Sequence, residues 1–197
     1  MNLTVALTGA SGALFGRELL SALASDPRVT HVDFIPSEAS LRVLAEELGI
    51  GGRSDLLAKL LPPSGDTEKF RQHSENDIGA GPASGSYPST AMIVLPCSMG
   101  TLAGIANGMA SNLIERAADV ALKERRPLIL CVRETPLNKI HLRNMTLAAD
   151  AGATIFPVIP SYYYHPGSLE DAARQFVFRV LTHVGLSQPG AYQWKAE

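Results

Sequence analysis

Two short loops rich in glycine and hydroxyl side chains could hold a phosphate group, because each lies between an apolar run and a helical pattern. Residues 8–12 read Thr-Gly-Ala-Ser-Gly, and residues 96–101 read Pro-Cys-Ser-Met-Gly-Thr. Open backbone N–H groups and the dipole at a helix start favour an anion. The spacing of Gly9, Gly12 and Gly16 differs from the G-x-G-x-x-G of dinucleotide sites, which disfavours NAD. A tight turn or a simple helix cap would explain either loop alone.

A hydroxyl group and an Arg-Glu pair follow two further apolar runs and could extend the same site. Ser37 comes after the second run, where a serine is also an ordinary helix N-cap. Arg133 could hold a carbonyl or phosphate group, and Glu134 could act as acid or base if its pKa is raised. The alternative for these two residues is a surface ion pair. Ligands of open α/β sheets bind outside the carboxyl ends of the strands, so two anion cradles at one edge fit a mononucleotide.

Cationic side chains in the middle of the chain could bind a second phosphate. Arg116 and Lys123 are seven residues apart and therefore project from one side of a helix. The alternative is a solvated face on which Asp119 and Lys123 form an i,i+4 pair. The neighbouring Arg125-Arg126 is expected to be surface charge at a helix end.

Tyrosine and histidine side chains follow the last apolar run. The segment Tyr162-Tyr163-Tyr164-His165 could bind a phosphate through hydroxyl groups and cover an apolar group with its rings, or simply pack as a loop. Arg179 lies within the last helical pattern, where a surface residue is the ordinary expectation. His165 has no Asp and Ser partners in a recognisable arrangement, so a Ser-His-Asp hydrolase is not predicted. Cys97 and Cys131 lack metal-ligand spacing, and buried reduced thiols are expected.

The elements that must position these residues alternate between strand and helix, as in a doubly wound α/β fold. The run 91–95 contains no polar residue, which is typical of a parallel sheet covered on both faces. The stretch 49–87 is rich in Gly, Ser and Pro, and we expect a surface excursion with one helical piece near 54–61. Strands are expected at 3–7, 29–35, 91–95, 128–132 and 154–158, and helices at 14–24, 38–48, 101–109, 111–125, 138–151 and 168–185.

Length and composition indicate one globular domain over residues 1–197. Hydrophobic residues make up 46% of the chain and charged residues 18%, which supplies a sizeable core. The net charge of −2 gives no general attraction to nucleic acid or to an anionic membrane. The chain has no basic leader and no run of about 20 apolar residues, so we expect a cytoplasmic protein.

Eight segments, taken together, resemble the flavin prenyltransferases of the UbiX family, formerly described as aromatic acid or polyprenyl-hydroxybenzoate decarboxylases. The segments occur in the family's order over nearly the whole chain, and the block 96–136 is the most specific. They are residues 8–12, Ser37 with Ala39, 82–86, 96–101, 113–127, 133–136, 141–145 and 162–166.

This resemblance implies a flavodoxin-like (Rossmann-like) doubly wound parallel sheet in three layers. It implies that reduced FMN accepts a dimethylallyl group from dimethylallyl monophosphate at N5 and C6, with no metal ion involved. The sequence itself does not distinguish this donor from the diphosphate. The product would be the cofactor of a UbiD-type decarboxylase, either in ubiquinone biosynthesis or in aromatic acid breakdown. The family also forms homododecamers whose sites are shared between neighbouring subunits.

The resemblance also assigns roles to residues at matching positions. Glu134 would manage protons near the prenyl phosphate, Ser11 would relay a proton, and Glu47, next to Glu46, matches a second acidic position. Lys123 would be both catalytic and phosphate-binding, because cations stabilise charge that develops on a leaving phosphate. FMN would contact Gly9, Ala10, Ser11, Ser37, Ser98, Met99, Gly100, Thr101 and Arg133. The prenyl phosphate would contact Arg116, Lys123, Tyr163 and Arg179.

The chain departs from the family at Ile78, where some members have a tryptophan, and over residues 49–77, which match little. A second hypothesis is an FMN-dependent decarboxylase that oxidises a peptidyl or pantothenoyl cysteine. The Asn-Thr loop ending and the Met-Asn motif of that class do not occur here. A third hypothesis is a non-catalytic flavin carrier, which could lose the four residues Arg116, Lys123, Glu134 and Arg179. All four are present.

Overall fold

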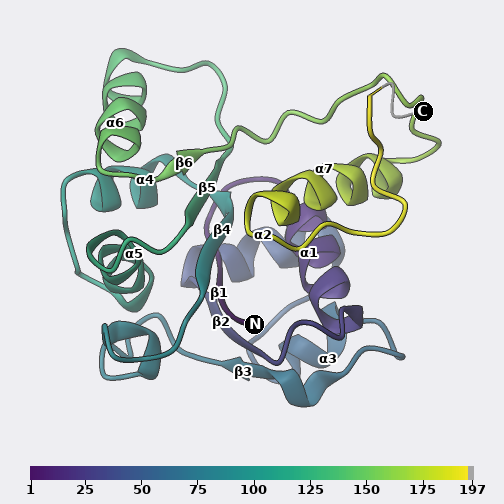
Figure 1. Cartoon of the computed structure of the whole chain (residues 1–197), viewed down its shortest axis with the longest axis horizontal. Helices are drawn as coiled ribbons and strands as arrows, with labels where there is room; N and C mark the ends of the chain where they lie inside the picture. Colours follow the sequence, from purple (N-terminus) through teal and green to yellow (C-terminus); the bar gives the residue numbers. More distant parts are fainter. Residues whose placement is uncertain (195–197) are drawn as a thin grey trace.

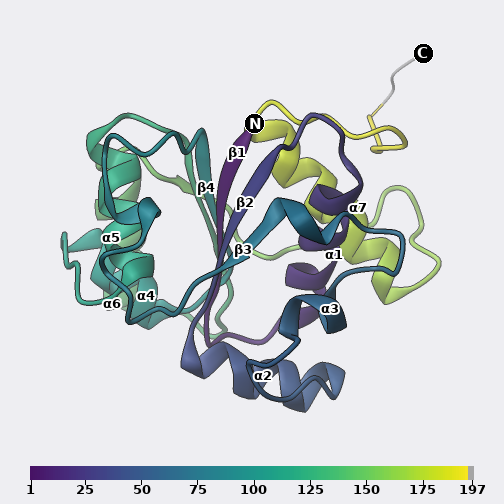
Figure 2. The same ribbon diagram turned by 90° about the horizontal axis from the view of Figure 1, so that it is seen from below.

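The structure is a computed structural model that describes residues 1–194. Its centre is a parallel sheet of six strands in the order β3-β2-β1-β4-β5-β6, with helices on both faces (Figures 1 and 2). The strands are β1 (Asn2–Leu7), β2 (His31–Pro36), β3 (Phe70–Gln72), β4 (Ala91–Cys97), β5 (Leu128–Val132) and β6 (Thr154–Ile155). The α-helices are α1 (Ala13–Ser25), α2 (Glu38–Leu48), α3 (Leu56–Leu60), α4 (Met99–Ala106), α5 (Leu113–Lys123), α6 (Lys139–Asp150) and α7 (Leu169–His183). The strand order reverses between β1 and β4, which is where ligands bind in doubly wound sheets.

Alternating side chains of the strands build two separate hydrophobic cores, one on each face of the sheet. Leu3, Val5 and Leu7 of β1 pack with α1, α3 and α7, whereas Ala6 faces the other core with α4, α5 and α6. Every residue of β4 and β5 is buried between these two cores. The three-layer, doubly wound α/β fold predicted from the sequence is therefore confirmed.

The two helical layers are well separated in space. Figure 1 shows α1 and α7 on one side of the sheet and α4, α5 and α6 on the other. The α1–α7 layer is joined by an edge-to-face contact between Phe15 and Phe176, whose ring centroids are 5.2 Å apart. Any two residues that belong to opposite layers are thus separated by the sheet within one chain.

The strand that ends the sheet is shorter than its apolar run suggested. A strand was expected over 154–158, but β6 comprises only Thr154–Ile155. The N–H groups of Phe156 and Val158 still bond to carbonyl groups of β5 at 2.9 Å. Pro157 lies between them at the open edge of the sheet, where its missing N–H group costs no bond to β5, so the pairing with β5 continues past the two residues of β6.

The stretch 49–87 contains more structure than the sequence predicted. The expected helical piece near 54–61 is α3, but the edge strand β3 was missed, as were two short 3-10 helices at 67–69 and 81–83. Strand β3 has only three residues, of which one is buried, so it carries no readable period. It pairs with β2 in parallel, with Val32 opposite Phe70.

A buried acid and a histidine tie the end of β3 to β2. Asp33 is 1% exposed, and its Oδ1 lies 2.7 Å from Nε2 of His73, which is also buried. Burial raises the pKa of Asp33, but interactions with His73, Tyr87 and His31 outweigh this effect, and the pKa lies below its ordinary value. Asp33 and His73 were not singled out from the sequence, since neither stands in a recognisable motif.

The two cysteines are free and buried, as expected from the apolar runs that contain them. Burial raises the pKa of the Cys97 thiol to about 12, which keeps it protonated and unreactive at neutral pH. Among residues 1–194, no helix is long and apolar enough to cross a membrane. In the same range, no three His, Cys, Asp or Glu side chains are grouped so that they could hold a metal ion.

Candidate functional site

Backbone hydrogen bonds bring the ends of the central strands together at one edge of the sheet. The N–H and hydroxyl groups of Thr8, after β1, donate to the carbonyl of Pro96 at 3.1 and 2.9 Å. The Thr8 hydroxyl in turn accepts from the N–H of Ser98 at 2.7 Å. The loops 8–12 and 96–101, which the sequence predicted to be two anion cradles, are therefore direct neighbours.

The ends of β2 and β5 join the same edge. The N–H of Ser37 donates to Leu7 of β1 at 2.9 Å, and the N–H of Arg133 donates to Cys97 of β4 at 3.1 Å. All residues assigned to FMN thus lie along one continuous edge of the sheet. They follow one another along this edge in the order of the strands that they end. The geometry of FMN contacts remains a prediction.

The start of α4 offers an open set of hydrogen-bond donors. Ser98 is the N-cap of α4, and its Oγ accepts from the N–H of Thr101 at 3.3 Å and lies 3.1 Å from Thr101 Oγ1. Within residues 1–194, the N–H groups of Met99 and Gly100 bond to no acceptor. Two hydroxyls and two free N–H groups at a helix start suit the phosphate of FMN.

The start of α1 is arranged differently, because a carboxylate occupies it. Both Glu47 oxygens accept from the N–H of Gly12, at 3.1 and 3.0 Å, and one also accepts from Ala13 at 2.8 Å. Glu47 comes from α2, so this contact was not readable from the sequence. It places the acid of Glu47, which the resemblance matched to a second acidic position, next in the structure to the loop that ends with the exposed Ser11 and Gly12.

Gly9 has a steric role at the point where β1 meets α2. A Cβ atom built at Gly9 would lie 2.5 Å from the Cβ of Ala39. Ser37, the N-cap of α2, accepts from the N–H of Ser40 at 3.0 Å and is buried, which confirms the cap predicted from the sequence. Glycine at position 9 therefore lets the α2 start approach the first loop.

Arg133 and Glu134 extend from the end of β5 into solvent and do not pair with each other. Both are exposed, and the Glu134 carboxylate accepts from the N–H of Thr135 at 2.9 Å. The surface ion pair that was the alternative for these residues is absent from the described part of the chain. Their side chains are free to meet a ligand at this edge.

Cations of α5 and of the turn that follows it contact the loop that precedes β4. Nε of Arg116 donates to the carbonyl of Ala83 at 3.1 Å, and Nη2 of Arg126 donates to Gly85 at 2.6 Å. Of the two residues expected to be surface charge at the helix end, Arg125 is exposed as predicted, whereas Arg126 is half-buried against the loop. The Asp119–Lys123 pair of the alternative interpretation is not formed, because Asp119 pairs with Arg116 and Lys123 pairs with Glu124.

Tyr163 and Arg179 line a cavity of about 660 Å³ on the other side of the sheet. Its walls are α7, the loop after β6 and the C-terminal segment 187–194. The ring of Tyr163 meets that of Trp194 edge-to-face at 4.8 Å. The cavity combines an aromatic wall with a guanidinium group, which suits a small apolar group attached to an anion.

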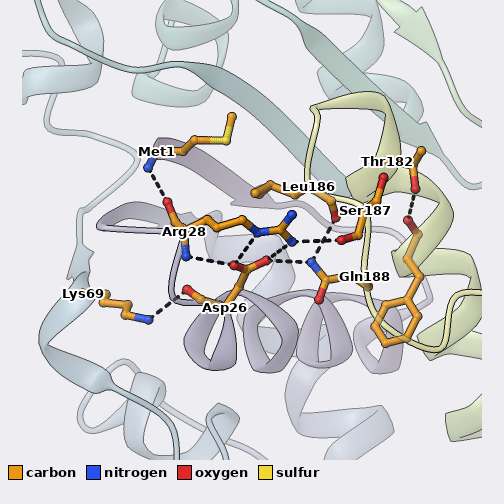
Figure 3. Close-up of polar contacts among 9 residues, drawn as sticks. Met1, Asp26, Arg28, Lys69, Thr182, Leu186, Ser187 and Gln188 are labelled. Carbon is orange, nitrogen blue, oxygen red and sulfur yellow. Dashed lines mark hydrogen bonds and ion pairs between the residues drawn. The ribbon is translucent and has the colours of Figure 1, made fainter.

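The C-terminal segment is held in place by a polar clasp, shown in Figure 3. Asp26 accepts from Gln188 Nε2 at 2.8 Å, and Arg28, paired with Asp26, donates to the carbonyl of Ser187 at 2.9 Å. Gln175 of α7 fixes the next turn through Gly190 and Tyr192. None of these residues was identified from the sequence, because their contacts span up to 162 positions.

The four residues assigned to the prenyl phosphate do not come together in one chain. Arg116 and Lys123 belong to the layer of α4, α5 and α6, whereas Tyr163 and Arg179 border α7 on the opposite face. Figure 1 shows these helices on opposite sides of the sheet. A single phosphate can touch both pairs only if they come from different copies of the chain.

Known proteins share this fold and sequence over nearly the whole chain. The family described as Flavoprotein matches residues 1–171. The flavin prenyltransferase UbiX of Pseudomonas aeruginosa is 42% identical over 196 residues, which are 98% of this chain and 93% of that protein. The flavin prenyltransferase UbiX of Salmonella typhimurium is 44% identical over 189 residues, covering 95% of this chain and 93% of that protein.

Solved structures agree with the sequence relatives. A dodecameric FMN-dependent UbiX-like decarboxylase from Escherichia coli superimposes with a TM-score of 0.89, at 39% identity over the whole of both chains. AnUbiX (PadA1), in complex with FMN and dimethylallyl pyrophosphate, gives 0.87 at 38% identity, covering 100% of this chain and 98% of that one. The chain is a member of the flavoprotein family, and within that family it belongs to the UbiX flavin prenyltransferases.

Proposed function

We propose that this chain transfers the dimethylallyl group of dimethylallyl monophosphate to N5 and C6 of reduced FMN. The observation that carries this proposal is the single sheet edge on which the loops after β1, β2, β4 and β5 meet, in a chain about 40% identical to flavin prenyltransferases along nearly its full length. Reduced FMN supplies the nucleophilic ring atoms when it is bound.

The residues of this edge have separate tasks. Met99, Gly100 and the hydroxyls of Ser98 and Thr101 hold the FMN phosphate, with Gly9, Ala10, Ser11, Ser37 and Arg133 along the rest of the flavin. Glu134, exposed at the end of β5, takes up a proton from the flavin as the new ring closes. Ser11 and Glu47 relay protons at the start of α1, where they are neighbours.

The prenyl phosphate is held by two subunits. Arg116 and Lys123 of one copy meet Tyr163 and Arg179 of another, since the sheet separates these pairs within one chain. Four such donors stabilise the charge that develops on the phosphate as the C–O bond breaks. A homododecamer is supported by the dodecameric Escherichia coli relative. We further propose that the product passes to a UbiD-type decarboxylase in the cytoplasm, a reducing setting with which the free thiols agree.

An anaerobic incubation tests the reaction directly. The protein is mixed with reduced FMN and dimethylallyl monophosphate, and the mass of the released flavin is measured by mass spectrometry. We expect a flavin heavier by one C5 prenyl unit, and no gain without the prenyl donor. FMN that stays bound but never gains mass would refute the transferase and favour a flavin carrier.

Subunit complementation tests the shared phosphate site. Lys123→Ala and Arg179→Ala are each expected to be inactive, and the two variants are then co-expressed so that they form mixed oligomers. If the cations come from different subunits, about a quarter of the sites in random mixtures regain both residues, and activity returns in that proportion. No recovery would show that both residues act within one chain.

A further inference from the structure

The two cations of α5 that are assigned to the prenyl phosphate already have carboxylate partners. Nη1 of Arg116 lies 2.5 Å from Asp119 Oδ2, and Nζ of Lys123 forms an ion pair with Glu124. Within residues 1–194, neither Arg133 nor Arg179 has a carboxylate at ion-pair distance. Among the predicted site cations, only those of α5 are therefore neutralised by their own chain.

Helix stability favours neither carboxylate strongly. Asp119 follows Arg116 by three positions, which is the less favourable order for a charged pair on a helix. Glu124 is the C-cap of α5, where the helix dipole disfavours an acid. The hydrogen bond and charge of Lys123 lower the pKa of Glu124, so the carboxylate is ionised at neutral pH.

The loop before β4 holds both pairs in place from the other side. Arg116 donates to the Ala83 carbonyl at 3.1 Å, so its guanidinium lies between that carbonyl and Asp119. A Cβ atom at Gly85 would overlap both the Glu124 carboxylate and the Lys123 ammonium group. The pairs thus lie beside this loop while their side chains stay partly open to solvent, and the charges within each pair cancel.

We propose that Asp119 and Glu124 are counter-ions of the prenyl-phosphate site that select the donor by its charge. This inference rests on the proposed function. The phosphate competes with each carboxylate for its cation, and the carboxylates repel the phosphate in proportion to its negative charge. A monophosphate carries about two negative charges at neutral pH. A diphosphate carries roughly one more, so it is disfavoured more strongly.

The test compares Asp119→Asn and Glu124→Gln with the unaltered chain, each saturated with FMN. Asp150→Asn is the matched control, because it removes one exposed carboxylate at the end of α6. Steady-state prenylation is measured with dimethylallyl monophosphate and with dimethylallyl diphosphate. Binding of inorganic phosphate and of each donor is measured separately by calorimetry, which needs no turnover.

We expect each site variant to lower KM for the monophosphate by about two- to fivefold, with kcat nearly unchanged. For the diphosphate, KM should fall by about twice as large a factor, because the carboxylates repel its greater charge more strongly. Calorimetric affinities should tighten in the same order, and Asp150→Asn should change neither. Unchanged or raised KM and Kd values in both variants would overturn the inference.

The proposed function and this inference fail in different ways. If the unaltered chain prenylates neither donor, the function is wrong, and phosphate binding still shows whether Asp119 and Glu124 weaken anion binding. If prenylation proceeds but both variants bind and turn over the two donors as the unaltered chain does, only the counter-ion role is wrong.

Discussion

Replacing Asp26 by asparagine is the most direct test of the clasp that holds the C-terminal segment. The buried carboxylate accepts three hydrogen bonds from Arg28, at 2.9, 2.9 and 2.6 Å, and one from Gln188 at 2.8 Å. Asparagine keeps the size of the side chain but removes its charge. Each carboxylate oxygen accepts two of these hydrogen bonds, so an amide NH₂ group in place of either oxygen would face two donors, and two hydrogen bonds would be lost.

The expected loss of stability follows from these contacts. A hydrogen bond to a charged group contributes about 1.5–3 kcal/mol, and breaking a buried ion pair costs about 3–5 kcal/mol. The Arg28 side chain is 46% exposed and can turn to water, so the cost should lie toward the lower end of these two ranges. We expect the free energy of unfolding to fall by about 2–3 kcal/mol. For a chain of 197 residues, this corresponds to a fall in Tm of about 4–12 °C.

The effect should depend on pH in a defined direction. The hydrogen bonds of Arg28, opposed by burial, hold the pKa of Asp26 well below its ordinary value of 3.8. A depressed pKa in the folded state contributes stability that is fully present above the unfolded value and is lost as the pH falls. The difference between Asp26→Asn and the unaltered chain should therefore be constant near neutral pH and shrink as the pH falls below about 4.

Thermal unfolding followed by circular dichroism measures this effect across the pH range. Asp150→Asn again serves as the control, because Asp150 is exposed and we expect its Tm to change by less than about 2 °C. Prenylation kinetics on the same samples report whether the cavity beside Arg179 depends on the clasp. A Tm for Asp26→Asn equal to that of the control, or a loss that persists undiminished in acid, would refute the reasoning.

Two further predictions concern the sheet edge. Gly9→Ala should cost about 1–3 kcal/mol and reduce the FMN bound per chain, because its methyl group would lie 2.5 Å from Ala39. Gly51→Ala, which has open space around it, should bind flavin normally by absorbance, and equal flavin content in both variants would contradict the steric role. Glu134→Gln should abolish prenylation while FMN stays bound, as mass spectrometry and absorbance together would show. Full activity in that variant would exclude Glu134 as the proton carrier.

The sequence predicted those parts of the fold that depend on neighbours in the chain. The strand at Leu128–Val132 was placed at its observed bounds, because a run of apolar residues bounded by Pro127 and Arg133 is a local signal. The cap at Ser37 was found for the same reason. The edge strand β3 was missed, because three residues with one buried side chain acquire a strand conformation only from pairing with β2.

The sequence by itself determined the fold class, the family and the residues that stand at the ends of the strands. Only the tertiary structure decided which of them meet. Glu47 reaches the start of α1 from another helix, and Asp119 pairs with Arg116 instead of with Lys123. The tertiary structure also placed Arg116 and Arg179 on opposite faces of the sheet. Such placement depends on crossover connections and on packing between distant segments. Neither can be predicted from residue type and local spacing.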